Sequence, residues 1–462
     1  MCGIIVALGA TPERIEHALP ALAHRGPDAA GLAVIGDVVL GHTRLAILDL
    51  NPRSNQPLTS GRTTVSYNGE LWNYRQLRAE LEASGRTFTT DGDTEVVAAA
   101  LDTWGDAALP RFNGMFALAW TQDGTTIQLS RDRYGEIPLH LTDSWPFLAA
   151  SEIKALQAAG AHPKAISLLE PGVLLTVSRQ GLRRRRWYDL PTVPRAIDRS
   201  AASQELRILI ERGVTERAIS DVPVCTLLSG GIDSAAVAWA LRQQLPDLVA
   251  YTAVYDPRAA DLRAARLVAN TLGIRLIEVP VERPTTTDLA RVIQQIEMPY
   301  KAQVEIGWAC LRLAERMRAD GFKVTFSGEG SDELWASYGF AYHALQTHDW
   351  HVYRKHLFLD QHRKNFARCN KVFMAYGIEC RLPFLHPSLV EFAISLPQSA
   401  VQAGKQRPKA VIQDAFMGRL PDPITRRAKV AFQDGMGLKR AIAERLPNPK
   451  RFYGAEYARY YG

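Results

Sequence analysis

The stretch VPVCTLLSGGIDSAAVAWAL, residues 222–241, decides the fold of the second half of the chain. Residues 222–228 are typical of a short apolar strand, a glycine-rich turn follows, and 234–245 has the pattern of a helix. Backbone N–H groups of a glycine loop that opens a helix bind anions, and the hydroxyls of Ser229 and Ser234 add donors. The loop lacks the Gly-Lys-Ser/Thr of a Walker loop and the GxGxxG of a dinucleotide turn. It therefore predicts a phosphate site of another kind, although an ordinary strand-to-helix turn is the plainer interpretation of this loop taken alone.

The same alternation continues along the second half of the chain. Residues 248–255 and 275–281 predict strands, with a helix at 261–272 between them. A further strand at 323–326 runs into a second glycine loop, SGEGSDE, at 327–333. Strands that alternate with helices predict a parallel sheet flanked by helices, and the chain beyond this loop is expected to be mainly helical.

The first half has a different pattern. Short apolar runs at 4–8, 38–40, 63–67, 116–120 and 172–177 stand between turn residues and predict mostly β-structure, with helices at 74–84 and 94–104. The segment 189–203 carries two prolines and little periodic apolar content. With 462 residues the chain exceeds one hydrophobic core. We predict a domain at 1–190, a linker at 191–202 and a second domain at 203–462.

Composition excludes several classes of protein. With 47% hydrophobic and 22% charged residues the chain is neither disordered, nor collagen-like, nor a disulfide miniprotein. The five cysteines show no CxxC spacing and the eleven histidines no HxH or HExxH pattern, which argues against a zinc site. Neither a membrane-spanning run nor a signal peptide is recognisable, so we expect a cytoplasmic protein without a membrane partner. The net charge of +7 does not indicate nucleic acid, and the run Arg183 to Arg186 is more simply a solvated strand than an RNA patch.

Cys2 is the first candidate catalytic residue. Removal of Met1 would leave a thiol and a free α-amine on one residue, and the amine can then act as base for the sulfur. Alone, Cys2 is as well explained by packing. It stands, however, with MCGI at 1–4, HRGPD at 24–28, GHTRLAILD at 41–49, YNGELWNY at 67–74, GDTEVV at 92–97 and RDRYG at 131–135. Together these motifs make the first 190 residues or so resemble the class II glutamine amidotransferase domain.

That resemblance implies an α+β sandwich of the Ntn-hydrolase type (αββα) and a set of roles. Cys2 would attack the glutamine amide, and Asn68 with the Gly69 backbone would stabilise the oxyanion. Arg44 would pair with the substrate carboxylate, and Glu70 and Asp93 would hold the substrate ammonium. Asn68 would also contact the glutamine. Taken one by one, Asn68-Gly69 is equally a hairpin turn and Asp93 equally a helix N-cap.

The second half resembles another family. The two glycine loops, with GIECRLPFL at 377–385 and RRAKVAFQDG at 426–435, are similar to the synthetase domain of asparagine synthetases and their β-lactam-forming relatives. The resemblance implies an α/β domain of the ATP-pyrophosphatase (adenine nucleotide α-hydrolase-like) type. It implies ATP contacts at Leu227, Ser229, Gly230, Gly231, Asp233, Ser234, Val254, Ser327 and Gly328. Asp233 and Asp332 would hold Mg²⁺ on the phosphates, Glu329 would be the base for the amine, and Lys429 would stabilise the charge of the reacting adenylate.

The two resemblances together imply a glutamine-hydrolysing, ATP-dependent amide synthase. Glutamine-derived ammonia would pass internally and attack an acyl-adenylate, giving an amide, AMP, pyrophosphate and glutamate. Aspartate is the default acceptor, but MPYKAQVEIGWA at 298–309, His386 and Glu136 depart from the family pattern. A pathway-specific acid, a β-lactam-type cyclase and a non-catalytic relative therefore stay open, as does a homodimer.

Overall fold

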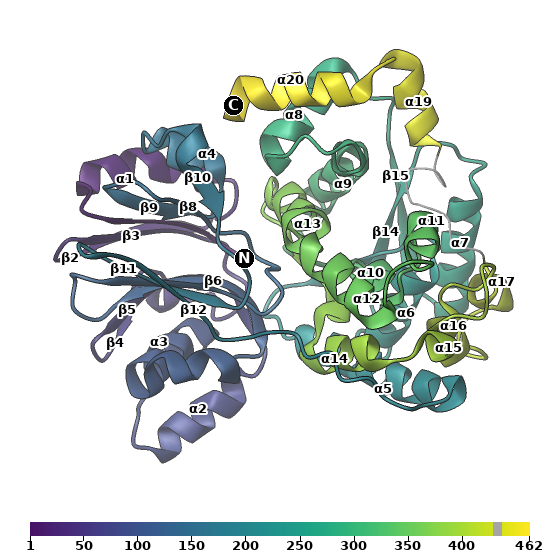
Figure 1. The fold of residues 1–462 in the computed structure, drawn as a ribbon, viewed down its shortest axis with the longest axis horizontal. Helices are drawn as coiled ribbons and strands as arrows, with labels where there is room; N and C mark the ends of the chain where they lie inside the picture. The colour runs from purple at the N-terminus through teal and green to yellow at the C-terminus, as the bar shows by residue number, and fades with distance from the viewer. Residues whose placement is uncertain (428–436) are drawn as a thin grey trace.

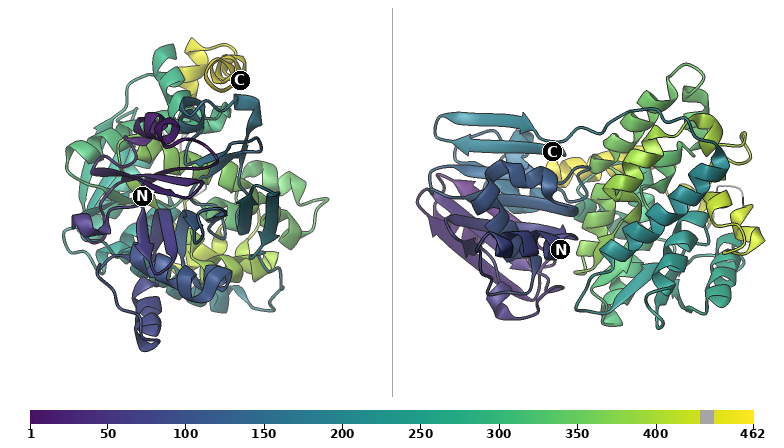
Figure 2. Two further views of the ribbon diagram at one scale, coloured as in Figure 1. Left: turned by 90° about the vertical axis from the view of Figure 1, so that its left-hand side faces the viewer. Right: turned by 90° about the horizontal axis from the view of Figure 1, so that it is seen from below.

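The structure, a computed structural model, describes residues 1–427 and 437–462 and shows two domains (Figure 1). A β-rich domain holds the N-terminal part of the chain, and a helix-rich domain holds the remainder. The two meet along one side, as the further views show (Figure 2). The last helix reaches back to the first domain, where Gln157 donates a 2.8 Å hydrogen bond to the carbonyl oxygen of Tyr460.

The N-terminal domain is built from two six-stranded antiparallel sheets. One sheet has the order β10-β8-β9-β1-β3-β2, and its strands are β1 (Gly3–Leu8), β2 (Ala29–Ile35), β3 (Val38–Arg44), β8 (His140–Thr142), β9 (Phe147–Ala150) and β10 (Ile166–Leu168). The other has the order β12-β11-β7-β6-β5-β4, with β4 (Leu58–Ser60), β5 (Thr63–Leu71), β6 (Gly114–Thr121), β7 (Ile127–Arg131), β11 (Val173–Ser178) and β12 (Gly181–Arg186).

Alternating side chains of β1 explain the layering. Ile4, Val6 and Leu8 enter the core between the two sheets, whereas Ile5 and Ala7 pack on the opposite face. The helices α1 (Pro12–Ala18) and α4 (Ile153–Ala158) cover that face, and α2 (Tyr74–Ala83) and α3 (Asp93–Trp104) cover the outer face of the second sheet. Both faces of β1 are therefore buried, which is why its sequence is continuously apolar. The expected αββα sandwich is confirmed.

The C-terminal domain has a five-stranded parallel sheet in the order β15-β14-β13-β16-β17. Its strands are β13 (Val224–Leu227), β14 (Val249–Val254), β15 (Arg275–Pro280), β16 (Val324–Phe326) and β17 (Glu379–Arg381). The chain moves outward from β13 to β15 and then returns to β16 on the other side of β13. In such sheets ligands bind outside the carboxyl ends of the strands where the order reverses. Both glycine loops leave the sheet at this point.

Helices surround this sheet and build most of the second domain. They are α5 (Arg199–Arg217), α6 (Ile232–Arg242), α7 (Ala260–Leu272), α8 (Thr286–Ile296), α9 (Lys301–Ala319), α10 (Ser331–Trp335), α11 (Gly339–Ala344), α12 (Trp350–Leu359), α13 (Asn365–Met374), α14 (Pro387–Ser395), α15 (Gln398–Val401), α16 (Ala410–Ala415), α17 (Asp422–Thr425), α19 (Leu438–Arg445) and α20 (Pro449–Tyr461). Within the described ranges, no helix combines the length and the apolar character that crossing a membrane requires.

Two details concern the expected boundaries. Residues 187–198 contain neither helix nor strand, and α5 begins at Arg199, inside the segment expected as linker. The run Arg183 to Arg186 lies in β12, an edge strand whose residues are all exposed, as the solvated-strand interpretation predicts.

Candidate active sites

Cys2 lies directly before β1 at the interface of the two domains. Its backbone N–H donates a 2.8 Å hydrogen bond to Oδ1 of Asn68. Burial raises the pKa of the Cys2 thiol, although the N-terminal ammonium, the Leu45 amide and the Arg44 guanidinium oppose that effect. A thiol in this environment needs a nearby base to become a nucleophile.

Asn68 and Gly69 lie within β5, so the hairpin-turn interpretation of this pair is wrong. They pair with Ala117 and Phe116 of β6, and the Asn68 side chain donates to Oγ of Ser151 at 3.2 Å. A Cβ on Gly69 would lie 2.2 Å from the Met115 carbonyl oxygen. Glycine is thus required here by the close approach of two strands, and the strand pairing holds the Asn68 amide beside Cys2.

Two buried carboxylates lie near this nucleophile. Asp93 is the first residue of α3, and the N-cap is Gly92, so the capping interpretation of Asp93 is wrong. Asp93 accepts hydrogen bonds from the Tyr67 hydroxyl (3.0 Å) and the Leu71 N–H (2.9 Å), and burial raises its pKa to about 6. Burial and neighbouring carboxylates raise the pKa of Glu70 well above its ordinary value. Its Oε2 has no hydrogen-bond partner among the described residues, and a substrate ammonium would supply one.

Arg44 ends β3 beside Cys2. Its Nη1 donates to the Asn51 carbonyl (3.0 Å) and the Asn55 side chain (2.8 Å), and its Nη2 to the Asp49 carbonyl (2.5 Å). The loop that follows β3 therefore already engages this guanidinium, and its expected role as carboxylate anchor stays a prediction.

A three-residue strand links Cys2 to the second domain. The Met1 ammonium forms an ion pair with Glu379 of β17, and Arg381 on the same strand donates to Glu379 at 2.7 Å. The Arg381 carbonyl in turn accepts a 3.0 Å hydrogen bond from the N–H of Ser327, the first residue of the second glycine loop. The N-terminus and the second glycine loop thus both contact β17.

Two residues that depart from the family pattern form contacts between domains or between elements. Glu136 makes a bidentate ion pair with Arg217 of α5, with both N–O distances 2.8 Å and both residues buried. His386 contacts Oε2 of Glu216 at 2.9 Å, and the same oxygen accepts from Asn113 of the first domain. Neither position reaches the phosphate loops, so these departures bear on domain docking.

The first glycine loop closes on itself ahead of α6. Ser229 N–H donates to the Ser234 hydroxyl at 3.1 Å, and that hydroxyl donates to the Gly231 carbonyl at 3.1 Å. Gly230 has φ of +79° and a Cβ there would meet the Asp261 carbonyl oxygen at 2.4 Å, so only glycine fits. The loop presents the N-terminus of α6 to the cavity at the carboxyl ends of β13 and β16.

Asp233 and Asp332 come together across the two loops. The Lys409 ammonium forms ion pairs with both, at 2.5 Å to Oδ1 of Asp332. Burial alone would lower the pKa of Lys409, but the two carboxylates outweigh it and raise the pKa above its ordinary value. Two carboxylates close enough to pair with the same ammonium could also bind one Mg²⁺ ion. Phosphate and water oxygens would then be its other ligands. No group of three or more His, Cys, Asp or Glu suited to a metal occurs within the described ranges.

One cavity brings most of the expected ATP residues together. Its lining includes Leu227, Ser229, Gly231, Asp233, Ser234, Ser327, Gly328, Glu329 and Asp332. Gly230 and Val254 do not line it, since Gly230 packs on α7 and the neighbouring Ala253 lines the wall instead. Lys429 lies outside the described residues.

Several polar lining residues escaped the sequence analysis, among them Lys409, Arg368, Gln413 and Arg427. Lys409 follows no glycine turn, and Arg368 and Gln413 lie in helical sequence, so no local signal marks them. Arg427 is the second residue of the late motif, donates to the Gly230 carbonyl at 3.0 Å and pairs with Asp261. Glu329 forms an ion pair with Arg368, separate from the ion pairs of Lys409 with Asp233 and Asp332.

Comparison with known proteins finds a matching family for each half of the chain. The glutamine amidotransferase domain family matches residues 1–179, and the asparagine synthase family matches residues 205–368 and 347–448. The chain belongs to the asparagine synthase family. Asparagine synthetase B [glutamine-hydrolyzing] of Escherichia coli is 30% identical over 95% of this chain and 83% of its own length. Relatives from Sandersonia aurantiaca and Arabidopsis thaliana are each 31% identical over 95% of this chain and cover 87% and 79% of their own lengths.

Membership in the asparagine synthase family agrees with the order of the two sites along the chain. The first 179 residues hold the Cys2 site, and the synthetase match begins at residue 205, near the start of α5. The sequence identity of about a third leaves the acceptor acid to be decided from the site itself.

Proposed function

We propose that the chain hydrolyses glutamine at Cys2 and uses the ammonia to convert an adenylated carboxylic acid into its amide. Membership in the asparagine synthase family supports an ATP-dependent carbon–nitrogen ligase with glutamine as amido donor. The observation that carries the proposal is Arg25, whose Nε donates a 2.9 Å hydrogen bond to the Cys2 carbonyl oxygen and whose Nη2 donates a 2.9 Å hydrogen bond to Oδ1 of Asn370 on α13. The same helix contributes Arg368, Cys369 and Phe373 to the cavity of the second domain, so one buried side chain connects the two sites and supports a single reaction sequence.

At the first site the Cys2 thiol attacks the glutamine amide carbon. After removal of Met1 the Cys2 nitrogen becomes the α-amine that takes the thiol proton. This nitrogen already donates a hydrogen bond to Oδ1 of Asn68. The oxyanion is stabilised by the Asn68 amide and the Gly69 N–H. Ammonia leaves, and water then hydrolyses the thioester to glutamate.

At the second site a carboxylate oxygen of the acceptor attacks the α-phosphorus of ATP, and the bond to pyrophosphate breaks. The loop from Ser229 to Ser234, Lys409 and Arg427 would hold the departing pyrophosphate. Asp233 and Asp332 would hold Mg²⁺, which supplies charge neutralisation on the phosphates when bound. Ammonia then attacks the acyl carbon, AMP leaves, and Glu329 accepts the proton that the amine loses. Lys429 is proposed to oppose the negative charge that develops.

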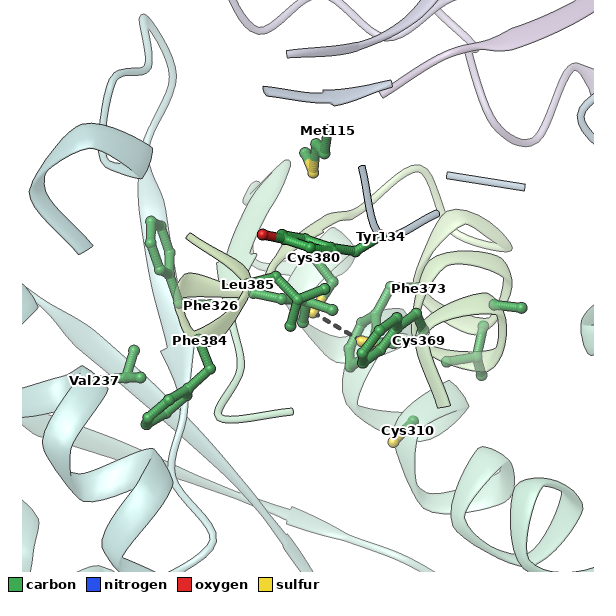
Figure 3. Packing of buried hydrophobic residues seen from close by; sticks show 14 of the residues in the cluster. Met115, Tyr134, Val237, Cys310, Phe326, Cys369, Phe373, Cys380, Phe384 and Leu385 are labelled. Carbon is green, nitrogen blue, oxygen red and sulfur yellow. Dashed lines mark hydrogen bonds between the residues drawn. The ribbon is translucent and has the colours of Figure 1, made fainter. Parts of the chain in front are cut away.

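We place the route of ammonia in the buried apolar region between the two sites. One continuous hydrophobic core includes Met1 and Met115 of the first domain and Cys380, Cys369 and Cys310 of the second. Figure 3 shows Met115 above Cys380, with Cys369 and then Cys310 farther from Met115. Apolar surroundings keep ammonia unprotonated and therefore nucleophilic.

Aspartate is the first acceptor to test, because the relatives are named as asparagine synthetases. The test follows pyrophosphate, AMP and glutamate over a panel of carboxylic acids with ATP, Mg²⁺ and glutamine. Equal amounts of pyrophosphate, glutamate and amide with one acid are expected. Pyrophosphate release that needs no acid, or glutamate formation without amide from any acid, would contradict the proposal.

A further inference from the structure

We infer that the acceptor is a monocarboxylic acid with an apolar body, anchored by Arg368 and seated against a wall formed by Cys310, Cys369 and Phe373. The inference rests on the proposed function and concerns the part of its cavity that Glu329, Arg368 and their apolar neighbours line. Cys310 belongs to α9, and Arg368, Cys369 and Phe373 belong to α13. Figure 3 shows Phe373 beside Cys369, with Cys310 below them.

Arg368 has the properties of a carboxylate anchor. It is a buried guanidinium that lines the cavity and pairs with Glu329, and its Nε has no hydrogen-bond partner among the described residues. Burial alone would lower the pKa of Arg368, but the Glu329 charge raises it, so the side chain stays cationic. A buried cation with donor capacity left over favours an anion from solution. The acid's own reacting carboxylate supplies that anion, and the guanidinium then faces the acyl oxygen as ammonia adds.

The wall beside Arg368 is apolar. Burial raises the pKa of the Cys310 thiol to about 12, so this sulfur stays neutral and behaves as a small apolar group. Cys369 and Phe373 are one helical turn apart and both face the cavity, with Ile306 and Leu313 of α9 completing the surface. Such a wall stabilises hydrocarbon and offers a bound ammonium no partner.

An amino diacid such as aspartate would need more than this surface provides. Besides the reacting carboxylate, its α-ammonium and second carboxylate would each require a partner when buried. In this part of the cavity, the charged side chains that the structure describes are Arg368 and Glu329, and these two already pair with each other. The remaining acidic residues of the lining pair with the cations Lys409 and Arg427. Apolar complementarity therefore favours an acid that carries one charge.

The test compares acids in one pyrophosphate-release assay with ATP, Mg²⁺ and glutamine. Benzoate and 3-methylbutanoate represent the proposed class, and aspartate and glutamate represent amino diacids. We expect kcat/KM for at least one apolar acid to exceed that for aspartate by about tenfold or more. A preference for aspartate overturns this inference and leaves the proposed function intact, whereas no acid-dependent release with any of the four overturns both.

Variants of α13 locate the effect. Phe373→Leu removes ring contacts from the wall, and Phe366→Leu makes the same change at a buried phenylalanine of the same helix that does not line the cavity. Phe373→Leu should lower kcat/KM for benzoate by about fivefold or more, on the scale of one lost apolar contact, with KM for ATP and glutaminase activity unchanged. Arg368→Lys keeps the positive charge but loses the planar guanidinium group, so KM for the acid should rise about tenfold while KM for ATP does not change. Equal effects of the two phenylalanine variants, or a shift of ATP rather than acid in Arg368→Lys, would refute the assignment.

Discussion

The contact between the two glycine loops can be tested by adding a single methyl group at Gly328. A Cβ at this position would lie 2.9 Å from the Ser234 nitrogen and 3.0 Å from the Asp233 Cβ. Carbon atoms pack best at about 3.5–4.0 Å, so the loops must separate by roughly 0.5–1 Å. Asp233 belongs to one loop and Asp332 to the other, and Lys409 bridges them. Gly328→Ala should therefore displace the side chains proposed to hold Mg²⁺ and phosphate relative to one another.

The expected loss follows from that displacement. Misplacement of catalytic groups by about 1 Å costs on the order of a hundredfold in rate, which corresponds to about 2.7 kcal/mol in the barrier. Pyrophosphate release with ATP, Mg²⁺ and the acid measures it, and glutaminase activity shows that the first domain is intact. Gly454→Ala is the matched control, because no described atom lies within 4 Å of its added Cβ. A Gly328→Ala enzyme within about twofold of wild type would refute the contact between the loops as a requirement for adenylylation.

The other predictions concern single residues of the two sites. Cys2→Ala should abolish glutamine-dependent amide formation and retain synthesis from ammonium salts; parallel loss of both in a folded variant would contradict separate sites. Asp332→Asn, or Asp233→Asn, should remove pyrophosphate release by about a hundredfold or more and leave glutaminase activity, since each change takes one charge from the proposed Mg²⁺ ligands; normal release from either would exclude the metal assignment. Glu329→Gln should slow the ammonia-dependent step, and Lys429→Ala both steps, by about a hundredfold in single-turnover assays, and wild-type rates in both would exclude these roles. Because burial raises the pKa of Asp93 to about 6, its carboxylate is protonated below that pH, so KM for glutamine should rise as pH falls through 6 and level off above 7; a flat profile would remove Asp93 from the ammonium site.

The local sequence pattern was sufficient to predict the helices and strands that are bounded by clear turn signals. The helix predicted at 261–272 is α7, Ala260–Leu272, and the strand predicted at 275–281 is β15, Arg275–Pro280. The helix predicted at 234–245 begins earlier, at Ile232, because the glycine loop ends sooner than the apolar pattern suggests. The sequence pattern did not predict α5, because its first turn follows prolines and shows no apolar periodicity.

Long-range contacts could not be predicted in the same way. The roles of Asn68 and Asp93 as turn and cap were reasonable from local sequence, and only the pairing of β5 with β6 and the bonds from Tyr67 and Leu71 exclude them. Lys409, directly before α16, and Arg368, on α13, join the cavity from positions far along the chain, through ion pairs that depend on tertiary packing. Glu136 departs from the family pattern, and its partner Arg217 lies 81 residues away.

Competition between two sources of nitrogen tests the coupling of the two sites most directly. The enzyme is supplied with ATP, Mg²⁺, its acid, glutamine labelled with ¹⁵N in the side-chain amide, and an excess of unlabelled ammonium in the buffer. Mass spectrometry of the amide product gives the fraction that carries the label. Transfer through the buried core between Met115 and Cys310 predicts a labelled fraction far above the share of ¹⁵N in the total ammonia pool. A labelled fraction equal to that share would show that ammonia reaches the second site through solvent, and would contradict the coupled reaction.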